Sequence, residues 1–320
     1  MQNYSNIQKF LHDFVLSKKI INKSLFELEK IIYLKNKDIS NQSHVFITGL
    51  PRSGTTSLLN FLFSSHEYAS LIYRNMPFVF SPNFFKLFNK KNIKKKERVH
   101  NDGIRYDLNS PEAFDEIFFD NSEEFIRNEL ENYINLILLK NDKNKYLSKN
   151  NLNYKRIDLI QSILPHSIFL IPIRKPLHQA NSLLSQHLHF NRLHQENDFI
   201  RRYMNYLGHH EFGLNHKPWN NPIHFNDPNN INYWIEQWCL FYELIYKKFQ
   251  FFKNCHFVIY EKLHNPSYVE KILNKINLEK NKNIDLQFFS NSNKKDINIE
   301  YDKNIFYKSQ LLYQKFLKFN

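Results

Sequence analysis

The chain has 320 residues, of which 42% are hydrophobic, so it can bury one sizeable core and shows no clear second domain. No run of 18 or more apolar residues occurs, which excludes a membrane-spanning helix. Cys239 and Cys255 do not make a disulfide framework and no secretory signal pattern is seen, so we expect a cytoplasmic protein. We interpret most of the formal net charge of +13 as lysine on solvated faces, with a surface for an anionic partner as the alternative, and no zinc-finger spacing or RNA-binding signature indicates nucleic acid.

The hydrophobic pattern predicts strands that alternate with helices. Residues 1–43 are expected to form N-terminal helices, because apolar residues recur there at helical spacing. Apolar runs predict strands at 44–50, 145–149, 167–174 and 255–260. Amphipathic patterns predict further helices at 55–64, 123–138, 157–164, 177–190, 231–252, 266–276 and 305–319. We therefore expect one α/β domain over residues 1–320, with a mainly parallel sheet flanked by helices.

Two stretches lack such a pattern. Residues 66–120 contain several prolines and are expected to be irregular. Residues 191–230 are rich in His, Asn and Pro, and we interpret them as an insertion over the ligand-binding edge of the sheet. Within the strand at 167–174, Pro172 predicts either an edge position in the sheet or an irregularity near the strand's end.

The loop between the first strand and the following helix has the composition of an anion-binding site. Gly49 and Gly54 have the G-x-x-x-x-G spacing of a P-loop, and backbone N–H groups at a helix N-terminus favour negative charge. A nucleotide triphosphatase needs Lys after the second Gly. Here that position is Thr55, and the cation lies inside the loop as Arg52. The loop therefore suits a ligand with one phosphate at that end better than it suits ATP.

This loop resembles the 5′-phosphosulfate loop of sulfotransferases, including tyrosylprotein sulfotransferases, through Leu50-Pro51-Arg52-Ser53-Gly54-Thr55-Thr56. These P-loop-related enzymes use 3′-phosphoadenosine 5′-phosphosulfate (PAPS). The likeness covers about residues 44–276, includes uncharacterised bacterial sulfotransferases, and implies a P-loop NTPase-like fold. It also implies that the donor is bound by Arg52, Ser53, Gly54, Thr55, Thr56 and Ser57.

A second signature resembles the 3′-phosphate motif of the same family. Arg174 closes a predicted strand, and Ser182 follows eight residues later in the next helix. An Arg fork and a Ser hydroxyl suit the 3′-phosphate that PAPS carries and ordinary nucleotides lack. The plainer interpretations are a structural ion pair for Arg174 and a surface hydroxyl for Ser182.

Two more residues acquire roles through the resemblance. Lys149 resembles the Lys that ends a central strand in many sulfotransferases and faces the transferred sulfuryl group; an exposed turn Lys is the alternative. Tyr260, in Tyr-Glu-Lys-Leu, resembles the late Y-E-x-L stretch, which implies contact with adenine; a core Tyr is the alternative. Sulfuryl transfer is expected to be an in-line displacement in which Arg52 and Lys149 stabilise the leaving phosphate, without a metal.

The general base is the least determined part of the site. Cytosolic sulfotransferases have a Lys-x-His element, but Asn151 stands at the His position here. His100 and Asp102, in His-Asn-Asp-Gly, are the predicted base candidates, with Glu112 and Glu116 next. The stretch His209-His210-Glu211-Phe212-Gly213 lacks H-E-x-x-H spacing, so we interpret it as acceptor wall or plain structure and expect no metal.

Two other functions compete with a PAPS-dependent sulfotransferase. A P-loop nucleotide kinase is disfavoured because no Lys follows Gly54. A non-catalytic protein that binds nucleotides or acidic glycans would keep the basic surface without needing Lys149. For the sulfotransferase, the acceptor is expected to be a hydroxyl of a saccharide or a lipid.

Overall fold

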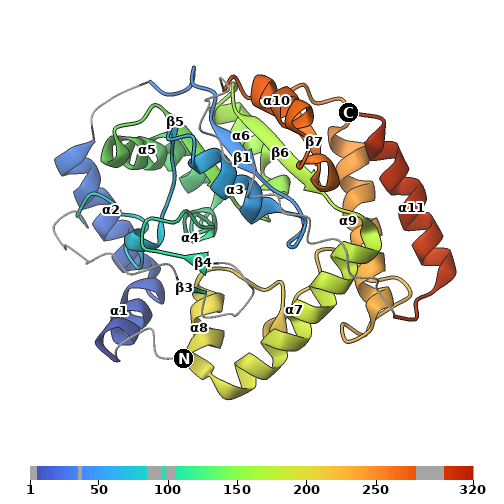
Figure 1. Ribbon diagram of the computed structural model, residues 1–320. Coiled ribbons are helices and arrows are strands. Elements are labelled where there is room, and N and C mark those ends of the chain that lie inside the picture. Colours follow the sequence, from blue (N-terminus) through green and yellow to red (C-terminus); the bar gives the residue numbers. More distant parts are fainter. Residues whose placement is uncertain (1–5, 35–37, 85–95, 98–104, 279–298, 320) are drawn as a thin grey trace.

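The computed structural model describes residues 6–34, 38–84, 96–97, 105–278 and 299–319. At its centre lies a five-stranded parallel sheet in the order β2-β5-β1-β6-β7 (Figure 1). The strands are β1 (Val45–Ile47), β2 (Tyr68–Ala69), β5 (Lys145–Lys149), β6 (Ile168–Ile173) and β7 (Cys255–Ile259). A separate antiparallel pair is formed by β3 (Lys96–Glu97) and β4 (Arg105–Tyr106). The predicted α/β class and mainly parallel sheet are confirmed, but β2 comes from the stretch expected to be irregular.

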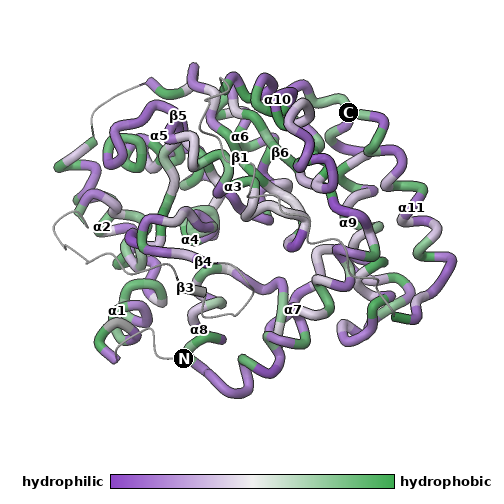
Figure 2. Tube along the Cα trace, viewed as in Figure 1, coloured by the Kyte–Doolittle hydropathy of each residue, from purple (hydrophilic) through white to green (hydrophobic). Residues whose placement is uncertain are grey.

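Helices flank the sheet and extend around it. They are α1 (Asn6–Leu16), α2 (Lys19–Tyr33), α3 (Thr55–Phe63), α4 (Glu116–Phe119), α5 (Glu123–Asn141), α6 (Ile157–Ile163), α7 (Pro176–Glu196), α8 (Asp198–Tyr206), α9 (Ile231–Phe249), α10 (Pro266–Lys275) and α11 (Lys303–Leu317). Helices α3 and α5 contact β2 and β5, whereas α11 contacts β7 and α9. Hydrophobic residues gather on the central strands and alternate with hydrophilic ones along α11 (Figure 2). No helix in the described ranges is long and apolar enough to cross a bilayer.

The stretch 191–230 is more regular than its composition predicts. Helix α7 continues to Glu196, and α8 begins at Asp198, where Asn197 Oδ1 accepts the N–H of Ile200. Tyr203 and Met204 of α8 are buried, so this short helix has an apolar face among its charged residues. In Figure 1, α7 runs away from the sheet and α8 turns the chain back. The expectation of irregular structure was therefore wrong for residues 191–206.

Pro172 lies in an interior strand, so its predicted edge position is wrong. Strand β6 pairs with β1 and β7. The N–H of Ile168 donates toward β1, to His44 O, and the N–H of Phe169 donates toward β7, to Asn254 O. By this alternation an N–H at position 172 would face β1, but the β1 ladder ends in register with Leu170. The last bond between these strands runs from the N–H of Thr48 to Leu170 O, and Pro172 has no N–H to donate the next one, so the ladder ends there. This is the irregularity near the strand's end that was the other expectation.

A buried carboxyl group contacts strand β5 of the sheet. It belongs to Asp115, just before α4, which is 2% exposed. Its Oδ2 accepts hydrogen bonds from Ser148 Oγ and, at 3.3 Å, from Tyr146 Oη, both on β5. Burial raises the pKa of Asp115 to about 6, against the opposing effect of the Ser148 hydrogen bond. The protonated form of Asp115 therefore favours the folded state.

The first prediction concerns the pH dependence of stability. The unfolded chain releases the Asp115 proton near its ordinary pKa of 3.8, but the folded chain holds it to about 6. The stability that Asp115 contributes is fully present below its unfolded-state pKa and is lost as the pH rises through its folded-state pKa. The free energy of unfolding falls by about 3 kcal/mol over this range. Urea unfolding between pH 4 and 7 should show this loss in the wild type and not in Asp115→Asn. Equal pH slopes in the two proteins would contradict the account.

Candidate functional site

The loop between β1 and α3 has a backbone that only a few residue types adopt easily. Arg52 has φ 65° and Gly54 has φ 101°. Ser53 Oγ donates to Leu50 O at 2.8 Å and holds the turn closed. A Cβ on Gly54 would lie 2.3 Å from Cδ2 of Tyr260, so this aromatic ring packs directly on the glycine. Helix α3 then begins at Thr55, and its first N–H groups face the loop without intrahelical partners, as an anion cradle requires.

Arg52 connects the two predicted phosphate motifs. Its Nε donates to Ser182 Oγ on α7 at 2.9 Å, and Arg174 Nη1, at the end of β6, donates to Arg52 O at 3.2 Å. The guanidinium of Arg174 also lies over the ring of Tyr260, 5.2 Å from its centroid. The structure therefore brings together four residues that the sequence places up to about 200 positions apart.

Lys149 lies beside the loop because its strand is in register with β1. It pairs with Ile47, two residues before Gly49, and its side chain is 8% exposed. Lys149 Nζ lies 3.7 Å from Glu112 Oε1. The same carboxylate accepts hydrogen bonds from Tyr73 Oη at 2.9 Å and from the N–H of Ala113 at 2.9 Å. Glu112 is thus held by its neighbours at the position where it balances the lysine.

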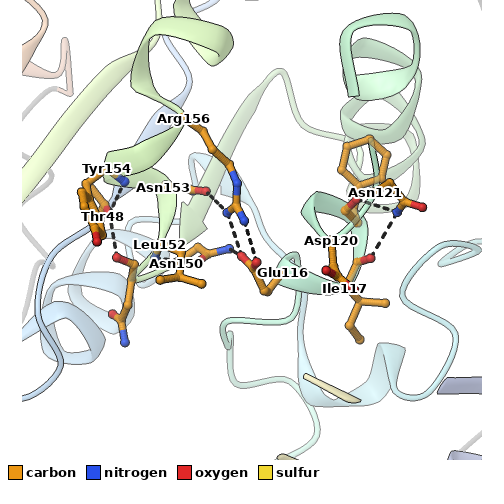
Figure 3. Close-up of polar contacts among 12 residues, drawn as sticks. Thr48, Glu116, Ile117, Asp120, Asn121, Asn150, Leu152, Asn153, Tyr154 and Arg156 are labelled. Carbon is orange, nitrogen blue, oxygen red and sulfur yellow. Dashed lines mark hydrogen bonds and ion pairs between the residues drawn. The ribbon is translucent and has the colours of Figure 1, made fainter. Parts of the chain in front are cut away.

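The turn after Lys149 is fixed by a buried ion pair (Figure 3). Arg156 Nη1 and Nη2 donate to the two oxygens of Glu116 at 2.7 and 2.6 Å, and Asn150 Nδ2 donates to Glu116 Oε2 at 2.7 Å. On the other side, Thr48 Oγ1 accepts the N–H of Tyr154 at 2.9 Å. Glu116, a base candidate from the sequence, is engaged in this support and does not line the cavity described next.

A cavity of about 130 Å³ lies against the loop. Its polar residues come mainly from the loop, the end of β5 and the segment after α8, and its apolar residues mainly from α7, α8 and that same segment. They are Pro51, Arg52, Thr55, Thr56, Tyr73, Glu112, Phe114, Lys149, Asn151, Gln186, Phe190, Tyr203, Met204, Leu207, His209, Glu211 and Phe212. Sequence reasoning missed the contribution of α8, although the spacing of its apolar residues carries a helical signal.

His209 and Glu211 form an ion pair at the cavity wall, with 3.4 Å between Nδ1 and Oε2. Burial opposes charge on both groups, but each stabilises the charge of the other. Burial lowers the pKa of His209, but the charge of Glu211, its hydrogen bond with the ring and the charge of Glu112 together outweigh burial, so the pKa is raised. The pKa of Glu211 is lowered to about 2, although burial alone would raise it, because of His209 and the hydrogen bond from Asn151.

The described residues place most of the predicted site at one sheet edge. Arg52, Thr55, Thr56 and Lys149 line the cavity. Ser53 is buried in the turn, Ser57 lies farther along α3, and Arg174, Ser182 and Tyr260 lie around Arg52 outside the cavity lining. His100 and Asp102 lie outside the described residues, so their assignment as base stays a prediction. Within the described part of the chain, no three His, Cys, Asp or Glu side chains gather as metal ligands do.

Comparison with known proteins identifies the class to which this fold and site belong. A model of the sulfotransferase family matches residues 44–281, and the chain belongs to that family. Two similar solved structures are the sulfotransferases STF1 from Mycobacterium tuberculosis H37Rv and STF9 from Mycobacterium avium, each with a TM-score of 0.51 and 11% identity. The alignments cover 98% and 99% of this chain and 87% of each mycobacterial chain, and they show a shared fold. No curated protein sequence matches this chain.

The packing of Tyr260 on Gly54 leads to a second prediction. Gly54→Ala should lower the free energy of unfolding by about 2–4 kcal/mol, because the new Cβ meets the ring and because φ is positive. In a Tyr260→Ala background the same change should cost only the backbone part, about 1–2 kcal/mol. Chemical denaturation of the four proteins in this cycle measures the difference. An equal loss of unfolding free energy in both backgrounds would show that the Tyr260 ring does not clash with a Cβ at position 54.

Proposed function

We propose that this protein transfers the sulfuryl group of PAPS to a hydroxyl of an acceptor. The observation that carries the proposal is the meeting of the two phosphate motifs at Arg52, whose side chain reaches Ser182 and whose carbonyl accepts from Arg174. A donor with a 5′-phosphosulfate and a 3′-phosphate has two anionic ends that need separate cradles, and this arrangement supplies both. Family membership supports the same conclusion.

The residues present fit such a donor. The N–H groups of the Gly49–Thr56 loop and the hydroxyls of Thr55 and Thr56 suit the 5′ end. Arg174 and Ser182 suit the 3′-phosphate, since a guanidinium gives charged, forked hydrogen bonds. Tyr260 lies against both Gly54 and Arg174, between the two anionic ends, which favours contact with the nucleoside.

Catalysis would rest on positioning and on charge. PAPS supplies an activated sulfuryl group, and its transfer is an in-line displacement. Lys149 and Arg52 line one cavity, so both cations can neutralise the charge that develops on the leaving 5′-phosphate. Glu112 holds the Lys149 ammonium in this place. Because the lysine is nearly buried, its charge acts in a medium that screens it less than water does.

The acceptor is proposed to be a hydroxyl of a saccharide or a lipid. The wall formed by α7, α8 and the following segment carries Phe190, Met204, Leu207 and Phe212, all buried and all lining the cavity. These apolar side chains suit the body of a lipid, whereas Gln186 and Tyr73 of the same cavity offer polar groups to a saccharide hydroxyl. Buried free thiols at Cys239 and Cys255 are compatible with the proposed cytoplasmic location.

The two alternatives explain less of the site. A nucleotide kinase would need a Lys where Thr55 begins α3. A non-catalytic binding protein would not need a lysine nearly buried beside a carboxylate in the cavity.

The third prediction separates these functions by thermal melts with three nucleotides. The desulfated product, 3′-phosphoadenosine 5′-phosphate (PAP), should stabilise the protein by about 2.7 kcal/mol at a hundredfold excess over its Kd. For a chain of this size the melting temperature rises by roughly several degrees. Adenosine 5′-phosphate and Mg-ATP should give smaller shifts, because they lack the 3′-phosphate.

The same melts run with and without a chelator provide the control. A chelator should leave the PAP shift unchanged. A larger shift with Mg-ATP than with PAP would favour the kinase, and equal shifts with all three nucleotides would favour unselective binding.

A further inference from the structure

We propose that His209, oriented by Glu211, is the general base that deprotonates the acceptor hydroxyl. The inference rests on the proposed sulfuryl transfer and assigns roles to His209 and Glu211, which line the cavity, and none to the side chain of His210 between them. Asn151, two residues after Lys149, also lines the cavity, and its side chain contacts Glu211.

A chain of contacts leads from Asn151 to an imidazole. Asn151 Nδ2 donates to Glu211 Oε1 at 3.0 Å, and Glu211 Oε2 lies 3.4 Å from His209 Nδ1. The segment after α8 thus delivers a histidine to the same cavity that Lys149 lines. An imidazole that can accept a proton therefore lies at the cavity that Lys149 and Arg52 line.

The segment that carries the pair is anchored at both ends. The N–H of His209 donates to Met204 O at 2.9 Å, and the N–H of Lys217 donates to His210 O at 2.8 Å. His216 Nδ1 lies 2.8 Å from Glu211 O. These contacts hold the backbone around His209 while its side chain, 24% exposed, lies at the cavity. The geometry is that of a base whose ring is fixed through Nδ1, leaving Nε2 as the nitrogen that accepts a proton.

The step balances without any further reactant. The acceptor oxygen forms a bond to sulfur, and its proton moves to Nε2 of His209. The bond between sulfur and the bridging oxygen breaks, and its electron pair leaves with the 5′-phosphate, beside Lys149 and Arg52. The imidazolium that forms is stabilised by Glu211, while Glu112 remains the partner of Lys149.

The charged groups around the ring set the pH at which the base works. Glu211 and Glu112 favour the imidazolium, whereas burial and Lys149 oppose it, and the pKa of His209 is raised above its ordinary 6.5. A base must be neutral, so activity should fall as pH drops through this raised value. Removing the charge of Glu211 should move the acid limb of the pH profile to lower pH.

The test measures turnover and PAP binding from pH 5 to 9. Labelled PAPS is supplied with water and with octyl glucoside as probe acceptors, and labelled sulfate and sulfated glycoside are counted. His209→Asn should lower kcat by 10²- to 10⁴-fold and abolish the acid limb, with the Kd for PAP unchanged. Glu211→Gln should shift the acid limb downward. His210→Asn, the matched control on the neighbouring residue, should keep the wild-type profile.

A second readout does not depend on the acceptor. Imidazole NMR titration should give His209 a pKa above 6.5 that falls in Glu211→Gln. An unchanged pKa, or full turnover in His209→Asn, overturns the inference. So does loss of the acid limb in His100→Ala or Asp102→Ala in place of His209→Asn. Absence of both turnover and PAP binding in the wild type would instead overturn the proposed function, so the two failures are distinguishable.

Discussion

The parallel pairing of β5, β1 and β6 is the constraint on which the site depends. Because three neighbouring strands end at one edge, the Gly49 loop, Lys149 and Arg174 meet there although they are far apart in sequence. The register is specific: Ile47 lies opposite both Lys149 and Leu170. Since successive side chains along a strand point to opposite faces, a shift of one residue would turn Lys149 away from the cavity.

Carboxylates from other elements hold the groups at this edge. Glu112 lies beside the Lys149 ammonium, and Glu261 accepts the backbone N–H of Lys175, next to Arg174, at 2.7 Å. Glu211, with His209, supplies the third carboxylate at the cavity. Because these contacts already hold the cationic side chains in place, little reorganisation is required when negative charge develops on a bound donor.

Local patterns allowed much of this architecture to be predicted. The apolar runs of the strands and the glycine spacing of the loop are signals within about ten residues. Arg174 and Lys149 were chosen through the resemblance to sulfotransferases, and both stand at predicted strand ends. Contacts across long separations were not predictable: Asn151 is 60 positions from Glu211, and nothing near either residue indicates the other. The interior position of Pro172 was not predictable, because the strands on either side of β6 come from segments far away in the sequence.

Binding of a 3′-phosphate by Arg174 would distinguish a PAPS-dependent enzyme from the alternatives, and calorimetry of two nucleotides on the wild type and on Arg174→Ala tests it directly. PAP and adenosine 5′-phosphate differ only in that group. Arg174→Ala should weaken PAP by about 10- to 100-fold, the equivalent of a lost charged hydrogen bond of about 1.5–3 kcal/mol, and leave adenosine 5′-phosphate unchanged. Equal weakening of both nucleotides, or unchanged binding of PAP, would contradict the account.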